Sequence, residues 1–163
     1  MAINEFRIES FLDNEELHYF RATTDEGGAW FLMFGQKTGV HIRLLEDGEC
    51  LLVRSLPLVH LDEYDEAGQT RVLRAMAQRN DQIMVGRYSG TETVIVEAAL
   101  PIEDGEVSDN QIRRLLGVIV NESNYFGPQL RSTASDKDFV VECDPIDDLM
   151  RKLIEGGEPS DGE

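Results

Sequence analysis

Residues 69–126 read QTRVLRAMAQRNDQIMVGRYSGTETVIVEAALPIEDGEVSDNQIRRLLGVIVNESNYF, and they predict a helix, a tight β-hairpin and a second helix in that order. The first helix spans residues 69–80, where apolar side chains recur at helical spacing opposite arginine and glutamine. Its apolar stripe consists of Val72, Leu73, Met76 and Ala77. Asn80 and Asp81 end the helix and lead into the hairpin.

The hairpin consists of two runs, residues 83–88 and 93–98, that are rich in β-branched and aromatic residues. Turn residues at 89–91 separate the two runs. After a loop over residues 101–107, Ser108 and Gln111 have the spacing of a capping box, which predicts a helix start. This second helix is expected to end near Gly127-Pro128, because both residues are helix stop signals.

The N-terminal part of the chain predicts a helix over residues 3–12 and then an antiparallel meander of four strands. Turn clusters separate the four runs. Residues 30–34 (WFLMF) are uniformly apolar and are interpreted as a strand buried on both faces. In residues 40–44 apolar side chains alternate with His41 and Arg43, so this strand has one buried and one wet face. The fold class is α+β, with element order α-β-β-β-β-α-β-β-α plus a C-terminal helix.

The last 32 residues divide into a polar linker, a helix and a tail. The linker covers residues 132–143 and contains a candidate short strand at 139–141, and the acidic tail at 156–163 is expected to be disordered. Residues 144–155 have the caps of a helix, with aspartate at the N-cap, proline at N1 and glycine after the last turn. Its apolar stripe, the candidate protein-binding surface, is Ile146, Leu149, Met150, Leu153 and Ile154. The sequence leaves open whether this stripe packs in cis or on another chain.

The net charge of the chain excludes some classes of binding partner. The chain has a formal charge of −17, which repels phosphate backbones and anionic lipid surfaces, so neither nucleic acid nor a membrane surface is expected as a partner. A basic or amphipathic protein partner is compatible with this charge. No apolar run is long enough to span a bilayer, and the N-terminus lacks the apolar core of a signal peptide. With two isolated cysteines and no CxxC motif, a cytoplasmic protein is expected.

Motifs for chemistry are missing from the sequence. It has no phosphate-binding glycine loop, no nucleophile elbow and no HExxH zinc motif. The three histidines fall on different predicted elements, and the acidic run at 62–66 lacks the glycine and the final glutamate of a calcium-binding loop. We therefore predict no catalytic residue, no cofactor and no metal site, and we do not expect an enzyme.

Several of these motifs resemble the YbjN family. The helix ending in Asn80, followed by residues 83–88 with Gly86-Arg87-Tyr88, is similar to the helix-to-strand signature of that family. Residues 99–102 (ALPI) resemble its Leu-Pro loop, and residues 112–131 resemble its last helix. The chain departs from the family in having MAQR at 76–79, where a leucine-rich asparagine motif is common. The resemblance covers roughly residues 3–131, so the domain boundary is placed at 1–131.

The resemblance implies the fold of type III secretion chaperones, a twisted antiparallel sheet with helices packed against it, often as a homodimer. It also implies a non-enzymatic, chaperone-like role in which partner segments are held on a sheet edge or an apolar helix face. The alternative is a dimeric regulator or adaptor in bacterial signalling. A small-ligand binder or an enzyme with an unrecognised site is the third hypothesis.

Overall fold

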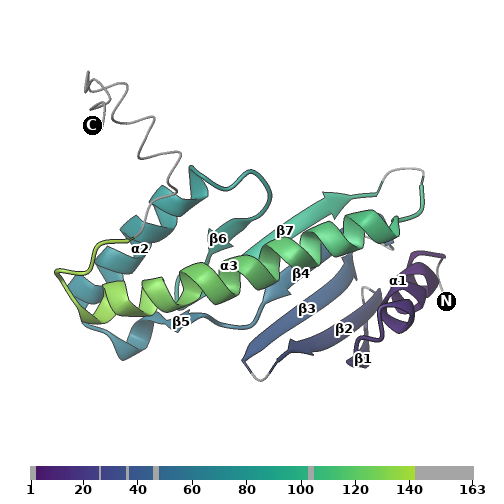
Figure 1. Ribbon diagram of the computed structural model, residues 1–163, viewed down its shortest axis with the longest axis horizontal. Coiled ribbons are helices and arrows are strands. Elements are labelled where there is room, and N and C mark those ends of the chain that lie inside the picture. The colour runs from purple at the N-terminus through teal and green to yellow at the C-terminus, as the bar shows by residue number, and fades with distance from the viewer. Residues whose placement is uncertain (1–2, 26, 36, 46–47, 103–104, 142–163) are drawn as a thin grey trace, which may run out of the picture.

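A seven-stranded antiparallel sheet is the frame of the molecule (Figure 1). The structure is a computed structural model and describes residues 3–25, 27–35, 37–45, 48–102 and 105–141. The strands are β1 (Tyr19–Thr24), β2 (Gly27–Phe34), β3 (Thr38–Leu45), β4 (Cys50–Ser55), β5 (Val59–His60), β6 (Arg87–Ser89) and β7 (Thr93–Pro101). They follow the order β1-β2-β3-β4-β7-β5, and β6 pairs with β7. The predicted four-strand meander is therefore confirmed, as is the α+β fold class.

The two ends of the sheet are formed by β1 and β6. Glu97 of β7 pairs with Arg54 of β4 and with Arg87 of β6, so β4 and β6 lie on opposite sides of β7. At the other end, β1 pairs with β2 alone among the described strands. One side of the β1 backbone is thus without a strand neighbour.

Three helices pack against this sheet, α1 (Ile3–Asn14), α2 (Glu66–Asn80) and α3 (Asp109–Ser135). In Figure 1, α3 crosses the sheet on the same side as α1, and α2 lies beside α3 near β5 and β6. Trp30, Ile42 and Val53, which occupy one register row, are completely buried under these helices. The helix predicted over residues 3–12 is α1, and it contributes Ile8, Phe11 and Leu12 to the core.

The α3 helix begins as predicted and ends later than predicted. The Ser108 hydroxyl accepts a hydrogen bond from the Gln111 backbone N–H, and the Gln111 side chain returns to Ser108, which completes the capping box. However, the helix continues through Pro128 to Ser135. Residues 132–135, assigned to the linker from the sequence, are therefore helical, and residues 139–141 form no strand.

Two predicted burial patterns are wrong. On α2, Val72 and Met76 are buried as expected, but Leu73 is 45% exposed and Ala77 is also exposed. Gly68 and Ala75 are buried instead, so the buried face of this helix is rotated from the predicted one. In β2, Phe31 and Met33 are exposed, so residues 30–34 are buried on one face only. Within the described residues, no helix covers that second face.

Candidate functional site: the uncovered face of the sheet

One residue from each of six strands forms a continuous row across the uncovered face of the sheet. Strand register aligns neighbours in the row, and side-chain alternation turns them away from the helices. In strand order the row is Phe20, Phe31, His41, Arg54, Glu97 and Arg87. Its first half is aromatic and its second half is charged.

The aromatic half lies on β1, β2 and β3. Phe20 is 69% exposed and Phe31 is 39% exposed, and their ring centroids are 6.4 Å apart. The Phe31 ring stacks on the His41 imidazole, with centroids 4.4 Å apart and planes only 2° from parallel. Large apolar side chains exposed together, rather than singly, are typical of interaction surfaces.

Met33 and Leu56 extend this apolar area along the sheet. Met33 is 57% exposed and pairs in register with Gly39 of β3. Leu56, which follows β4, is 44% exposed and lies directly over Gly39, where an added Cβ would be 2.2 Å from its Cδ1. Glycine at position 39 therefore lets Leu56 come next to Met33. We call Phe20, Phe31, Met33 and Leu56 together the apolar strip.

Glu97 is the centre of the charged half. Its carboxylate is almost fully buried and accepts hydrogen bonds from Arg54 Nε at 2.7 Å, Arg87 Nε at 3.1 Å and Ser89 Oγ at 3.1 Å. Burial alone would raise the pKa of Glu97, but the Arg54 hydrogen bond and charge, helped by Ser89 and Arg87, hold this pKa below its ordinary value. The carboxylate is therefore ionised at neutral pH.

His41 joins the two halves. Its Nε2 atom is buried and has no hydrogen-bond partner in the described part of the chain. Burial lowers the pKa of the imidazole, and the charges of Arg43 and Arg54 lower it further. His41 is thus neutral at pH 7, and its ring serves as an aromatic surface against Phe31.

The two ends of the sheet differ in how open they are. At β6, the side-chain amide of Asn80 accepts a hydrogen bond from Tyr88 N at 2.6 Å and donates one to Tyr88 O at 3.0 Å. The amide therefore occupies the position of a neighbouring strand and closes this edge. No such cap is found along β1 in the described residues, so the apolar strip lies next to the open edge.

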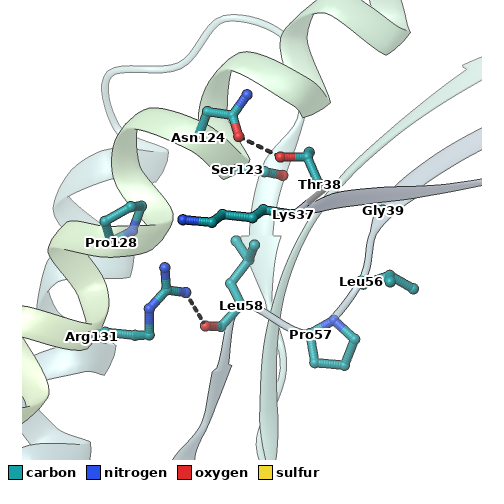
Figure 2. Close-up of a pocket in the computed structure, with 10 residues that line it drawn as sticks. All are labelled: Lys37, Thr38, Gly39, Leu56, Pro57, Leu58, Ser123, Asn124, Pro128 and Arg131. Carbon is teal, nitrogen blue, oxygen red and sulfur yellow. Dashed lines mark hydrogen bonds between the residues drawn. The ribbon is translucent and has the colours of Figure 1, made fainter. Parts of the chain in front are cut away.

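A pocket of about 360 Å³ lies near Leu56, where the β2–β3 turn, the segment after β4 and the middle of α3 meet (Figure 2). Lys37 extends across it towards α3, and Arg131 of α3 lies beside it. Its remaining walls are the apolar side chains of Leu56, Pro57, Leu58 and Pro128 with the polar Thr38, Ser123 and Asn124.

The binding residues predicted from the sequence are not placed by this structure. Ile146, Leu149, Met150, Leu153 and Ile154 all lie outside the described residues. The sequence did not predict the apolar strip, because WFLMF was interpreted as doubly buried. Among the described residues no cluster of histidine, cysteine, aspartate and glutamate could hold a metal, and no helix is long and apolar enough to cross a membrane.

The sequence matches the model of a known protein family. The sequence model of the YbjN family, described as "Putative bacterial sensory transduction regulator", matches residues 6–132. No curated protein matches the chain significantly. The match to the family model covers most of the described residues, including the uncovered sheet face and nearly all of α3.

Solved structures share this fold. A chain of the ExsC–ExsE complex has a TM-score of 0.58 at 19% identity, covering 78% of this chain and 92% of that one. The Yersinia pestis type III secretion chaperone SycH, solved with a stable fragment of YscM2, has a TM-score of 0.51 at 15% identity, covering 76% and 98%. YbjN from E. coli, described as "a putative transcription regulator", has a TM-score of 0.56 at 12% identity, covering 83% and 96%. The expected chaperone-like fold is thereby confirmed.

Proposed function

The chain belongs to the YbjN family, and on that basis we propose that it is a chaperone-like, protein-binding molecule. It holds segments of partner proteins on the uncovered face of the sheet. The observation that supports this most is the apolar strip beside the open edge of β1. The shared fold with a type III secretion chaperone agrees with the proposal.

An extended segment suits this surface physically. Its backbone pairs with the outer side of β1, and alternate side chains then fall on the face that carries Phe20 and Phe31. Burying a phenylalanine ring contributes about 1.5–3 kcal/mol. Two rings and a few backbone hydrogen bonds give enough free energy for reversible holding, which is what a chaperone needs.

We propose no catalytic role and no cofactor for this surface. In the described strands, the one carboxylate of the row is occupied by Arg54, Arg87 and Ser89, and the one imidazole is half-buried and neutral. A general acid or base needs an accessible group with a pKa near the working pH. Neither Glu97 nor His41 meets that requirement.

A holding assay tests the proposal with one matched pair of variants. The full chain is mixed at equimolar ratio with thermally unfolding citrate synthase, and aggregation is followed by light scattering. We expect the wild type to suppress aggregation and Phe20→Ser to lose most of that effect. Phe6→Ser is the control, because Phe6 on α1 is 63% exposed and lies away from the strip. Equal losses in both variants, or no suppression by the wild type, would contradict the proposal.

A dimeric regulator or adaptor is the second candidate, favoured by the description of the family as a sensory transduction regulator. An adaptor recognises one folded partner with a fixed stoichiometry, whereas a holding chaperone binds unfolded segments. Binding of the native but not the unfolded form of a partner to the Phe20 surface would favour the adaptor.

A further inference from the structure

Lys37 and Arg131 are two cations that have no acidic partner among the described residues of a strongly acidic molecule. The chain has 32 aspartate and glutamate residues against 15 lysine and arginine residues. Most described arginines are engaged, such as Arg79 with Glu122 at 2.6 Å and Arg113 with Glu15 at 2.5 Å. In contrast, neither pocket cation forms a salt bridge with any described residue, although carboxylates are abundant elsewhere.

The neutral polar groups of the pocket already have partners. The Thr38 hydroxyl donates to Asn124 Oδ1 (Figure 2). The Ser123 hydroxyl donates to the Ile119 carbonyl at 2.6 Å. Arg131 uses one N–H for the Leu58 carbonyl at 2.8 Å, and its other donors remain. The Lys37 ammonium donates to no described residue. Besides the Asn124 side-chain N–H2 group, the donors left in the pocket are therefore the cationic groups of Lys37 and Arg131, and a set of donors with two cations suits an anion.

Two features select the class of anion. The pocket is walled by proline and leucine side chains, and one of these, Leu56, is also part of the apolar strip. An anion that carries an apolar group next to its charge therefore fits better than a fully hydrated ion. In addition, the −17 field of the chain repels a monoanion less than a multiply charged phosphate or nucleotide.

We propose that this pocket binds a peptide carboxylate between Lys37 and Arg131, while the apolar residue beside that carboxylate packs on Leu56. The carboxylate comes from the C-terminus of a partner segment or from its aspartate or glutamate side chain. This inference rests on the proposed function, because it assigns a recognition element to the same partner segment. It also predicts which segments are chosen, namely those with an acidic group next to apolar residues.

The test uses N-acetyl-leucine as the probe, since it combines a carboxylate with a leucine side chain. It is titrated into the ¹⁵N-labelled full chain at fixed ionic strength, and amide shifts are followed by NMR. We expect saturable shifts centred on residues 37–39, 58 and 124. N-acetyl-leucinamide, which lacks the charge, should produce none of them. Lys37→Gln should weaken binding about tenfold, as expected for the loss of one charge-assisted contact, and Arg74→Gln on exposed α2 should not.

Three outcomes would overturn the inference: shifts scattered away from the pocket, equal shifts with the amide, or binding unchanged by Lys37→Gln. Tighter binding of inorganic phosphate than of N-acetyl-leucine would overturn the choice of carboxylate. The test is separable from the holding assay, because Phe20→Ser should still bind the probe. Normal holding of citrate synthase without any probe binding refutes this inference alone, and probe binding without holding refutes the proposed function alone.

Discussion

Asn80 shows how a single side chain decides which edge of the sheet is available. Its amide binds both the N–H and the carbonyl of Tyr88, a residue that is 3% exposed. Gly86 precedes β6, and only glycine suits its position. Its φ is +90°, and a Cβ there would lie 2.9 Å from the Glu97 carbonyl oxygen. Arg87 then binds Glu97. Each residue of the motif formed by Asn80 and Gly86-Arg87-Tyr88 thus has a structural role.

Replacing Asn80 with alanine should leave two buried backbone groups of Tyr88 without partners. We expect the free energy of unfolding to fall by about 2 kcal/mol, because each buried hydrogen bond contributes about 1 kcal/mol and unpaired groups cost more. Urea denaturation measures the change. Asn121→Ala, on the exposed side of α3, is the matched control and should shift the midpoint little. A loss below about 0.5 kcal/mol for Asn80→Ala would mean that water or a neighbour replaces the amide.

His41 should make the stability of the molecule sensitive to mild acid. Its pKa in the folded state is lowered by burial and by Arg43 and Arg54, so below about pH 6.5 the unfolded chain binds a proton that the folded chain excludes. Stability contributed by the neutral imidazole is therefore complete well above pH 6.5 and decreases as the pH falls below that value.

Urea unfolding at pH 7.5 and pH 5.5 measures this difference. His41→Phe keeps an aromatic ring against Phe31 and should reduce the pH dependence, whereas His60→Gln, at an exposed site on β5, should retain it. If both variants keep the wild-type dependence, other groups are responsible for the acid sensitivity.

At the scale of elements, the start of α3 was predicted correctly from local signals and its end was not. The capping box at Ser108 was correctly predicted because both of its partners lie within one turn. Pro128 predicts a helix end, since proline lacks an N–H and disfavours a helix interior. The helix nevertheless continues, because Leu130 and Ala134 are buried and Arg71 of α2 binds the carbonyls of Thr133 and Ala134 at 2.9 and 2.7 Å. The Arg71 hydrogen bonds join residues more than 60 positions apart in the sequence, so no local sequence pattern predicts them.

The same limit applies to the candidate site. The composition of WFLMF shows that β2 is apolar, but whether a second layer covers Phe31 and Met33 depends on where the helices pack. The sequence does not distinguish the large apolar residues that are buried from those that are exposed in the fold. A usable signal was Phe20, which alternates with Tyr19 and Arg21 on a polar first strand. An aromatic residue in that context often marks a surface rather than a core.

For the whole molecule, net charge and local charge point to different partners. The −17 charge suggested a basic or amphipathic partner. However, the described strands place Arg54 and Arg87 on the uncovered face beside Glu97, and the adjoining pocket adds Lys37 and Arg131. A partner contacts one face and not the average of the molecule. We therefore expect this face to bind partner segments that are both apolar and acidic. The negative charge of the rest of the chain repels such segments from its other surfaces.

Self-association is the last property that this arrangement predicts. We expect the full chain and a chain ending at Val141 to have twice their monomer mass by light scattering, because the open β1 edge and the apolar strip are present in both. Phe20→Ser should shift both towards monomer, and Phe6→Ser should not. A dimer formed through β1 occupies the edge proposed for partner segments, so adding a bound segment should dissociate it. If only the full chain dimerises, the stripe at residues 146–154 forms the interface instead, and β1 is then left available to partners.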